Sequence, residues 1–532
     1  MSHVNSFGVR NLRSFGAETQ LVPIKKINIF VGRNSCGKST FLRTYPLLRQ
    51  SVESNTRSPI LWYGSYVDFG DLTTAVHDGS NKIYFDFNCE LDIETNFSDK
   101  YLYESQYFNS ITSLTKETLQ VNTDISIGLN LRNDKQVQSN SVITINNTEI
   151  VINYCAGQAQ DMVCTQYSLD PEKKQVNQLA FSNLYITSKG SILPTNIYGI
   201  KDSTDAQGKV VKHLDEDTIK KGAQQALLSY LKKYTSSTKS LAQRIEQLKL
   251  VEIKKLAREL TKIFPADKKF HMHLKELPNE IPETVFFYLI IRNFPRILTA
   301  ADRSFKGLFS GVRYLGPVRA SAERFYRHQD LEIGEVDHKG ENLPMVINSL
   351  DTRMKKHLSK WISDNFGFEL ELEASGLHYE LKIKEEHDAK FHNISDMGFG
   401  YSQILPVIVS IWLETVGADP RRHLGFTDSN SRTLVIEQPE LHLHPALQYR
   451  FGLAIAKVVS LASNLGFRIV IETHSSQMIE AIGESIRRGV ITDSDISIAL
   501  FEKNKNDCTE ITMSGFDDEG YLKNWPAGFL SA

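Results

Sequence analysis

The sequence contains few of the residues that mark specialised protein classes. Its cysteines are only five, odd in number and without the spacing of metal ligands, so we expect reduced thiols: Cys36, Cys89, Cys155, Cys164 and Cys508. Proline accounts for 16 of 532 residues, beside 41% hydrophobic and 23% charged residues. This composition excludes a disordered, collagen-like or low-complexity chain.

A large charge of one sign and long hydrophobic runs are also lacking. The 61 basic and 63 acidic residues leave a net charge of −2, so bulk charge does not indicate a nucleic-acid or membrane binder. The first 15 residues contain no long apolar stretch of the kind found in signal peptides. The most apolar run, Ile404–Leu413, is far shorter than the roughly 20 residues that cross a bilayer. We therefore expect a soluble, cytoplasmic protein.

The pattern of apolar residues changes along the chain. Between residues 82 and 199, short period-two runs separated by Asn, Asp, Gly and Ser predict antiparallel strands. Residues 217–264 are rich in Lys, Gln and Glu, and their apolar residues have helical spacing, which predicts a helical hairpin or arm. From residue 400 onward, predicted helices and strands alternate, as is typical of a mostly parallel sheet.

A phosphate-binding motif follows the apolar stretch Ile27–Val31 and precedes a helical pattern. It consists of Gly32, Arg33, Asn34, Ser35, Cys36, Gly37, Lys38, Ser39 and Thr40. In the pattern G-x-x-x-x-G-K-[ST], backbone N–H groups of the glycine-rich loop surround phosphate oxygens. We expect Lys38 to reach the β- and γ-phosphates of a nucleotide and the Ser39 hydroxyl to bind Mg²⁺.

Two later strands end in residues suited to nucleotide chemistry. The first ends in Glu437, a position that can hold Mg²⁺ opposite the phosphate loop. The second, residues 468–472, is followed by Thr-His-Ser, and we interpret His474 as a sensor of the γ-phosphate rather than a structural histidine. His442 and His444 have no cysteine or third ligand nearby, so we do not expect zinc there.

The two nucleotide motifs lie too far apart for an uninterrupted domain. Between Lys38 and Glu437 the numbering advances by 399 residues, more than a single P-loop domain contains. We therefore predict an α/β fold with a split P-loop ATPase head and a large insertion. The expected segments are the first half of the head, a β-rich segment, a helical arm, a connecting helical segment and the second half of the head, at residues 1–90, 91–215, 216–300, 301–370 and 371–532.

The order of these motifs resembles that of a known family. Between the insertion and the Glu437 strand lies Ser395–Gln403, with the sequence SDMGFGYSQ. The chain resembles ABC-type ATPases of the SMC, RecF and OLD-like kind, and more closely their relatives in bacterial phage defence. Four further segments match the narrower group, which is most similar to the PtuA-type ATPases of Septu-like or retron-associated systems: residues 64–72, 314–319, 437–445 and 524–529.

The resemblance implies an ATP-dependent homodimer. In that family Ser395, Gly398 and Gly400 would contact the γ-phosphate of a nucleotide bound to a second subunit. From the residues alone, the same glycine-rich turn is equally typical of a capped helix start. Asp68–Asp71 lies where these proteins link the nucleotide to the insertion, although an ordinary turn explains it as well.

One position departs from the family pattern. ABC ATPases usually carry Glu after the Mg²⁺-binding acid, where it polarises the attacking water, but this chain has Gln438. A carboxamide can orient water but cannot accept its proton, so general-base help of about 10²–10⁴-fold is missing. We expect Glu437, Gln438 and His474 to act on ATP, with Mg²⁺ held by Ser39 and Glu437, and turnover to be slow.

The resemblance favours an ATPase that acts as sensor or scaffold for a partner nuclease of the HNH type, with or without a retron reverse transcriptase and its msDNA. A repair or chromosome clamp that binds duplex DNA is the alternative. Eleven lysines of the predicted arm would contact phosphates in a clamp, although such a run is also typical of a solvated face: Lys220, Lys221, Lys232, Lys233, Lys239, Lys249, Lys254, Lys255, Lys262, Lys268 and Lys269.

We do not expect the chain itself to be a nuclease. Only 58 residues follow His474, too few for the Toprim domain of OLD-type nucleases. Asp517, Asp518 and Glu519 lie in a glycine-flanked turn, where solvated carboxylates are the simpler interpretation.

Overall fold

The structure is a computed structural model whose contacts divide the chain into two units. It describes residues 2–54, 56, 58–95, 118–132, 136–155, 160–168, 175–187, 190–204, 210–236, 240–327, 333–376, 378–415 and 431–525. The first unit comprises Met1–Gly8, Ser54–Ile60 and Asn81–Phe305, and the second comprises Val9–Glu53, Leu61–Ser80 and Lys306–Ala532. Lys239 and residues 526–529, which the sequence analysis singled out, lie outside the described residues.

The first unit is built on a large sheet whose strands from β4 to β11 pair antiparallel in chain order, as predicted. A two-residue turn at Asn146–Asn147 joins β6 to β7, and Asn146 has the positive φ (51°) that such tight hairpins require. The strands are β1 (His3–Arg10), β4 (Lys82–Glu94), β5 (Thr118–Arg132), β6 (Gln136–Ile145), β7 (Thr148–Cys155), β8 (Gln160–Tyr167), β9 (Gln175–Thr187), β10 (Asn196–Thr204) and β11 (Val210–Asp215).

Helices cover the apolar face of this sheet. Every second residue of β4 from Ile83 to Ile93 is buried, so one face of the strand is apolar. Helix α8 (Glu280–Arg292) contacts β8 and is buried on nearly all sides. Phe305 of α9 (Phe294–Phe309) packs on Phe87 of β4, with ring centroids 4.6 Å apart. The core of the unit therefore lies between the sheet and these two helices.

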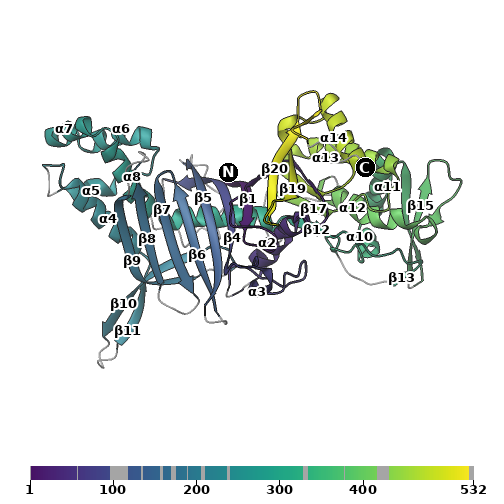
Figure 1. Ribbon diagram of the computed structural model, residues 1–532, viewed down its shortest axis with the longest axis horizontal. Coiled ribbons are helices and arrows are strands. Elements are labelled where there is room, and N and C mark those ends of the chain that lie inside the picture. Colours follow the sequence, from purple (N-terminus) through teal and green to yellow (C-terminus); the bar gives the residue numbers. More distant parts are fainter. Residues whose placement is uncertain are drawn as a thin grey trace. The chain divides into compact units, whose positions relative to one another are not determined.

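The predicted arm is helical but divided into short helices. These are α4 (Thr218–Leu231), α5 (Leu241–Glu246), α6 (Ile253–Ile263) and α7 (Lys268–Glu276), which gather with α8 at one end of the unit (Figure 1). The apolar stripe expected along this segment is shared between α5 and α6, because the chain leaves the helical conformation between them. Helices α8 and α9 are likewise separated at Asn293, two residues before Pro295 in the first turn of α9.

The second unit contains the predicted parallel sheet. Its order is β12-β17-β18-β3-β19-β20-β21, and the first five strands are parallel. All six residues of β3 are buried, as expected for a central strand covered on both faces. The strands are β12 (Val312–Leu315), β17 (Arg432–Glu437), β18 (Phe467–Glu472), β3 (Ile27–Gly32), β19 (Ile496–Lys503), β20 (Thr509–Phe516) and β21 (Leu522–Lys523).

The helices and remaining strands of this unit pack around that sheet. The apolar run Ile404–Leu413 is entirely buried within α12, and no helix of the described residues is both long and apolar enough to span a bilayer. The helices are α1 (Lys38–Leu42), α2 (Thr44–Glu53), α3 (Leu72–Ala75), α10 (Leu343–Asn348), α11 (Thr352–Phe366), α12 (Phe399–Thr415), α13 (Pro445–Leu461) and α14 (Ser476–Arg487). Strands β13 (Tyr326–Arg327), β14 (Phe368–Ser375), β15 (His378–Glu385) and β16 (His392–Asn393) form a small sheet of their own, and β2 (Val22–Pro23) is next to β1 in strand order.

Candidate nucleotide-binding site

The site lies in the second unit, where three parallel strands end side by side. The phosphate loop follows β3, Glu472 ends β18, and Glu437 ends β17. Because parallel strands point the same way, their carboxyl ends meet at one edge of the sheet, the usual place for ligands in such folds. The register pairs Glu437 with Glu472, and Glu472 with Phe30 of β3. Residues far apart in the sequence thus converge at this edge.

The phosphate loop wraps around a buried lysine. Lys38 is buried, and its Nζ donates hydrogen bonds to the carbonyl oxygens of Gly32 (3.0 Å) and Arg33 (2.7 Å). Burial lowers the pKa of Lys38, and the negative charge of Glu472 opposes this effect. Gly37 has φ +92°, and a Cβ there would lie 2.6 Å from Thr509 Oγ1, so the turn requires glycine. Around this lysine, Arg33, Asn34 and Ser35 are exposed, which leaves the loop open to a ligand.

Glu472 faces the loop directly. The Ser39 hydroxyl donates to Glu472 Oε1 at 3.0 Å, and Lys38 Nζ lies 3.9 Å from the same oxygen. The Glu472 side chain is 2% exposed, and its Oε2 has no hydrogen-bond partner among the described residues. Burial raises the pKa of Glu472 to about 7; the hydrogen bond from Ser39 opposes this rise and the charge of Glu437 adds to it.

Glu437 is held by other groups of the protein. Arg43 donates to both of its carboxylate oxygens, from Nε at 2.7 Å and from Nη2 at 2.9 Å, and the Tyr314 hydroxyl donates at 2.7 Å. The hydrogen bond to Glu437 raises the pKa of Arg43. Arg319 also donates to the backbone carbonyl of Glu437, at 2.9 Å. The acid predicted as a metal ligand is therefore neutralised by a bidentate arginine.

Gln438 and His474, the other predicted catalytic residues, lie at the same edge. Gln438 has φ +42° and is half-buried, and its backbone N–H donates to the Glu472 carbonyl at 2.8 Å. His474 is exposed overall, and partial desolvation of its side chain, together with the positive charge of Lys38, lowers its pKa. Its backbone N–H donates to Glu440 Oε1 at 2.6 Å, so this buried acid fixes the Thr-His-Ser turn.

The residues expected to contact a nucleotide on a second subunit, Ser395, Gly398 and Gly400, lie around the start of α12. Ser395 and Gly398 are exposed, and the Ser395 hydroxyl donates to Asn393 Oδ1 at 2.9 Å. Gly400 is packed more tightly, because a Cβ there would lie 2.7 Å from the His442 carbonyl oxygen. Gln403 of the same segment exchanges two hydrogen bonds of 3.0 Å with the backbone of Arg319. This pair connects the start of α12 to the strand end that carries Glu437.

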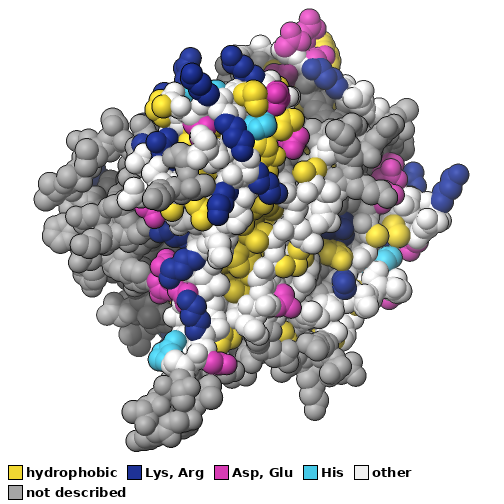
Figure 2. Space-filling view, turned by 90° about the vertical axis from the view of Figure 1, so that its left-hand side faces the viewer, with side chains coloured by type: hydrophobic (Ala, Val, Ile, Leu, Met, Phe, Trp, Pro, Cys, Tyr) yellow, Lys and Arg dark blue, Asp and Glu magenta, His cyan; other side chains and the backbone are white. Residues whose placement is uncertain are grey.

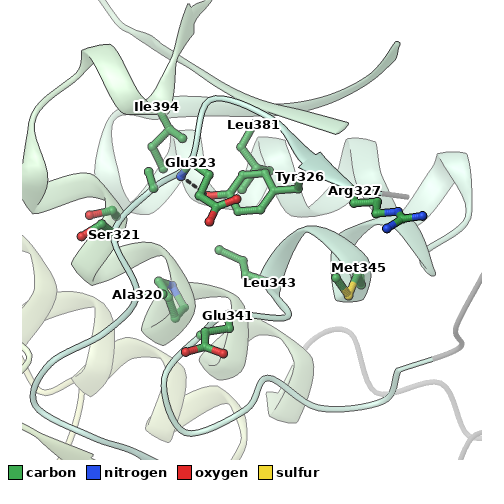
Figure 3. Close-up of a pocket in the computed structure, with 14 residues that line it drawn as sticks. Ala320, Ser321, Glu323, Tyr326, Arg327, Glu341, Leu343, Met345, Leu381 and Ile394 are labelled. Carbon is green, nitrogen blue, oxygen red and sulfur yellow. Dashed lines mark hydrogen bonds between the residues drawn. The ribbon is translucent and has the colours of Figure 1, made fainter. Parts of the chain in front are cut away.

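A cavity of about 220 Å³ lies behind the start of α12 and not at the phosphate loop (Figure 3). Residues 320–327, α10 and α12 line it, with Leu343 and Ile394 on its walls, and the Tyr326 hydroxyl accepts a hydrogen bond from the Glu323 backbone at one side. Of the predicted nucleotide-binding residues, none contributes to this lining.

The two acidic turns noted in the sequence, Asp68–Asp71 and Asp517–Glu519, contain hydrogen bonds within the protein. Asp71 accepts hydrogen bonds from the Thr74 backbone and side chain in a capping box that starts α3, and Gly70 N–H donates to Asp68. Asp517 accepts from the Tyr521 backbone within a turn. Within the described residues, no group of three or more His, Cys, Asp or Glu side chains is arranged to hold a metal ion.

Three residues of the site were not predicted from the sequence. Glu472 was recognised only as a strand end, Tyr314 only as part of a matching segment, and Arg43 not at all. Arg43 carried a usable signal, because it lies four residues after Ser39 on the same side of the helix. Tyr314 required knowledge of β12, a strand that the analysis had not predicted.

The model of the AAA ATPase domain family matches residues 3–479 of the chain. The chain belongs to this family. It is a P-loop ATPase, and the ligands that such a family implies are ATP and usually Mg²⁺. No curated protein matches the chain.

Solved structures similar to this ATPase come from SMC and RecF proteins. The Smc head domain of Pyrococcus furiosus, with an extended coiled coil and bound to the C-terminal domain of ScpA, is 11% identical over 96% of each chain, with a TM-score of 0.35. The SMC head domain from Thermotoga maritima is 9% identical, covering 96% of this chain and 98% of that one, with a TM-score of 0.32. RecF-ATPrS is 11% identical, covering 96% and 98%, with a TM-score of 0.29.

The residues present in this ATPase fit a magnesium nucleotide. The loop offers backbone N–H groups and Lys38 to phosphates. Mg²⁺ in nucleotide sites takes one or two protein oxygens together with phosphate oxygens and waters. The Ser39 hydroxyl and the unpartnered Glu472 Oε2 supply such oxygens within the described part of the chain.

We predict that Lys38→Ala weakens ATP binding by about 100-fold. The substitution removes the one buried ammonium of the loop, and the loss of its charged hydrogen bonds lowers affinity by about 100-fold. Equilibrium titration with a fluorescent ATP analogue measures the effect, and Lys505→Ala, at an exposed lysine of the same unit, is the matched control. Retention of wild-type affinity in Lys38→Ala would show that the nucleotide binds elsewhere.

Proposed function

We propose that this ATPase binds ATP with Mg²⁺ at the phosphate loop and hydrolyses it slowly. The observation that carries the proposal is the convergence of Lys38, Ser39 and buried carboxylates at the carboxyl ends of three parallel strands. Bound Mg²⁺ would stabilise the negative charge that develops on the transferred phosphate. Lys38 would hold the phosphates, and His474, whose ring lies near Lys38, would contact the γ-phosphate.

Slow turnover follows from the side chains near the expected position of the attacking water. Gln438 can accept or donate a hydrogen bond to water but cannot remove its proton. Glu440 is the nearest alternative in sequence, but its Oε1 already accepts the His474 backbone N–H and its side chain is buried. Glu440 is therefore a positioning residue for the Thr-His-Ser turn. An enzyme with this arrangement is better suited to hold ATP as a signal than to drive repeated motion.

We further propose that two copies of the chain dimerise around ATP. Ser395 and Gly398 lie exposed at the start of α12, where a hydroxyl and backbone N–H groups are available to a phosphate from outside the chain. The positive φ of Gly398 (85°) and the space for any Cβ there show that the glycine is needed for the turn and not for packing. Through Gln403 and Arg319, contacts at this turn would reach the strand end that carries Glu437.

The biological role that we propose is control of a partner nuclease in antiviral defence. The ATP-bound dimer would act as sensor and scaffold for an HNH-type nuclease, with or without a retron reverse transcriptase and its msDNA. Support comes from the segments that match phage-defence ATPases at both ends of the chain, and from the slow turnover expected of Gln438. Neighbouring reading frames for an HNH protein would favour this role, and metal-dependent DNA cleavage by the purified chain alone would contradict it.

A second candidate is a RecF- or SMC-like clamp on duplex DNA. It is favoured by nine exposed lysines on the helical segment. Figure 2, which shows the left-hand side of the view in Figure 1, has several Lys and Arg side chains in its upper part. The nine exposed lysines are Lys221, Lys232, Lys233, Lys249, Lys254, Lys255, Lys262, Lys268 and Lys269. Acidic neighbours pair with some of them, as Glu252 does with Lys255 at 2.8 Å and Glu259 with Lys262 at 2.6 Å. Such pairs weaken the positive field of the surface.

We predict that Gln438→Glu accelerates ATP hydrolysis by about 10²-fold or more, because a carboxylate at this position restores a general base. Single-turnover phosphate release at saturating ATP measures the chemical step. Gln477→Glu, a half-buried glutamine at the start of α14, is the matched control and should leave the rate unchanged. An unchanged rate in Gln438→Glu would show that another group already supplies the base.

We predict that Ser395→Arg prevents ATP-dependent dimerisation, because a long cation replaces a small hydroxyl at the proposed interface. Light scattering after size exclusion, with Mg²⁺ and a non-hydrolysable ATP analogue, should show dimers for the unsubstituted protein and monomers for the variant. Ser494→Arg places the same cation just before β19, at the opposite end of that strand from the phosphate-loop edge, and should still dimerise. Dimers of Ser395→Arg would refute the interface.

The two roles differ in what the helical lysines do. For a clamp, replacing Lys254, Lys268 and Lys269 by Ala removes about three phosphate contacts and lowers the salt slope of duplex binding by about 3. For nuclease control, we predict no duplex binding that depends on these lysines. Fluorescence anisotropy with a short duplex at several salt concentrations decides between them. The control variant replaces three exposed lysines of the second unit, Lys25, Lys505 and Lys523.

A further inference from the structure

Glu472 occupies the position closest to the phosphate loop. In the sheet order, β18 lies between β17 and β3, so the end of β18 is one strand from the loop and the end of β17 is two strands away. Both acids are the last residues of their strands and are paired in register. The acid that the sequence motif points to, Glu437, is therefore not the one adjacent to the loop.

The two carboxylates also differ in their partners. Glu437 accepts two hydrogen bonds from Arg43 and one from Tyr314, so its charge is compensated within the protein. Glu472 accepts one hydrogen bond from the Ser39 hydroxyl, and Lys38 Nζ is 3.9 Å away, while Lys38 itself donates to loop carbonyls. Glu472 Oε2 is buried and has no hydrogen-bond partner among the described residues. A buried carboxylate oxygen without a partner is costly unless a ligand satisfies it.

We propose that Glu472 is the protein carboxylate that binds the Mg²⁺ of the nucleotide, together with the Ser39 hydroxyl, while Glu437 is fixed by Arg43 and positions the strand end beside it. This inference rests on the proposed binding of ATP with Mg²⁺ at the phosphate loop. It follows from the chemistry of the cation, because Mg²⁺ selects hard oxygen ligands and a free carboxylate oxygen outcompetes one already bound bidentately to arginine. The Ser39 hydroxyl and Glu472 Oε1 lie 3.0 Å apart, a separation that two oxygen ligands of one Mg²⁺ can have.

A purely structural role for Glu472 makes a different prediction. If Glu472 only accepts the Ser39 hydrogen bond, then Gln at this position keeps an accepting oxygen of the same shape and leaves the response to Mg²⁺ unchanged. If Glu472 is a metal ligand, Gln removes the negative charge that the cation needs. The discriminating quantity is therefore the ratio of ATP affinities with Mg²⁺ and with EDTA, and not the rate of hydrolysis.

The experiment measures that ratio by equilibrium titration with a fluorescent ATP analogue, for full-length wild type, Glu472→Gln, Glu437→Gln and the exposed control Glu502→Gln. We expect Mg²⁺ to strengthen binding to wild type and Glu502→Gln. In Glu472→Gln the strengthening should fall by about tenfold or more, while the affinity in EDTA is retained. Binding of Mn²⁺ to the protein–nucleotide complex, followed by electron paramagnetic resonance, should weaken in parallel. Glu437→Gln should keep the larger part of the strengthening.

The outcomes separate this inference from the function on which it rests. If wild type does not bind ATP, the proposed function fails. If wild type binds and Glu472→Gln retains the full effect of Mg²⁺ while Glu437→Gln loses it, the function stands and the assignment to Glu472 is overturned. Melting temperatures establish that each variant is folded. Should Glu472→Gln not fold, Glu472→Asp replaces it: the shortened carboxylate should reduce the Mg²⁺ effect, and an undiminished effect would overturn the inference.

Discussion

The hydrogen bond between Ser39 and Glu472 connects residues 433 positions apart, and the nucleotide site depends on the packing that produces it. That packing is the parallel arrangement of β3 and β18, which places the loop after one strand beside the acid that ends the other. The inserted unit, residues 81–305 for the most part, lies between these strands in sequence but contributes no residue to the site as described. A long insertion can be accommodated because the entropy of closing a loop grows only slowly with its length.

Local patterns allowed much of this arrangement to be predicted from the sequence. The glycine-rich loop, Lys38 and Ser39 form a motif whose backbone conformation is set by neighbouring residues, and the structure has that loop after a buried strand. The parallel sheet was predictable because fully apolar strands alternate with helices after residue 400, and the antiparallel sheet because β4 shows strict alternation. The helical segment was predicted in kind but not in length, since the apolar spacing alone does not show where a helix stops.

The partners of the acids could not be predicted in the same way. Strand β18 lies between β17 and β3. This order is a property of the whole sheet and cannot be read from one segment of sequence, so the sequence showed only that Glu472 ends a strand. Tyr314 reaches Glu437 only because β12 pairs with β17, and β12 is too short to stand out in the sequence. Motif reasoning therefore found Glu437 but not the arginine that neutralises it. The metal assignment made from the motif, Ser39 with Glu437, stays a prediction for which Glu472 is the competing candidate.

Electrostatics explain why two adjacent strands can end in buried acids at all. Two carboxylates side by side at the end of a sheet repel each other. Arg43 compensates the charge of Glu437 through two hydrogen bonds, whereas burial raises the pKa of Glu472 to about 7 although the Ser39 hydrogen bond and the charge of Lys38 oppose the rise. A divalent cation arriving with ATP would complete that compensation, so the partly compensated charge of Glu472 would strengthen the binding of the magnesium nucleotide. Tight binding of ATP and the slow hydrolysis expected from Gln438 in place of a general base would then have the same consequence: ATP would stay bound for a long time.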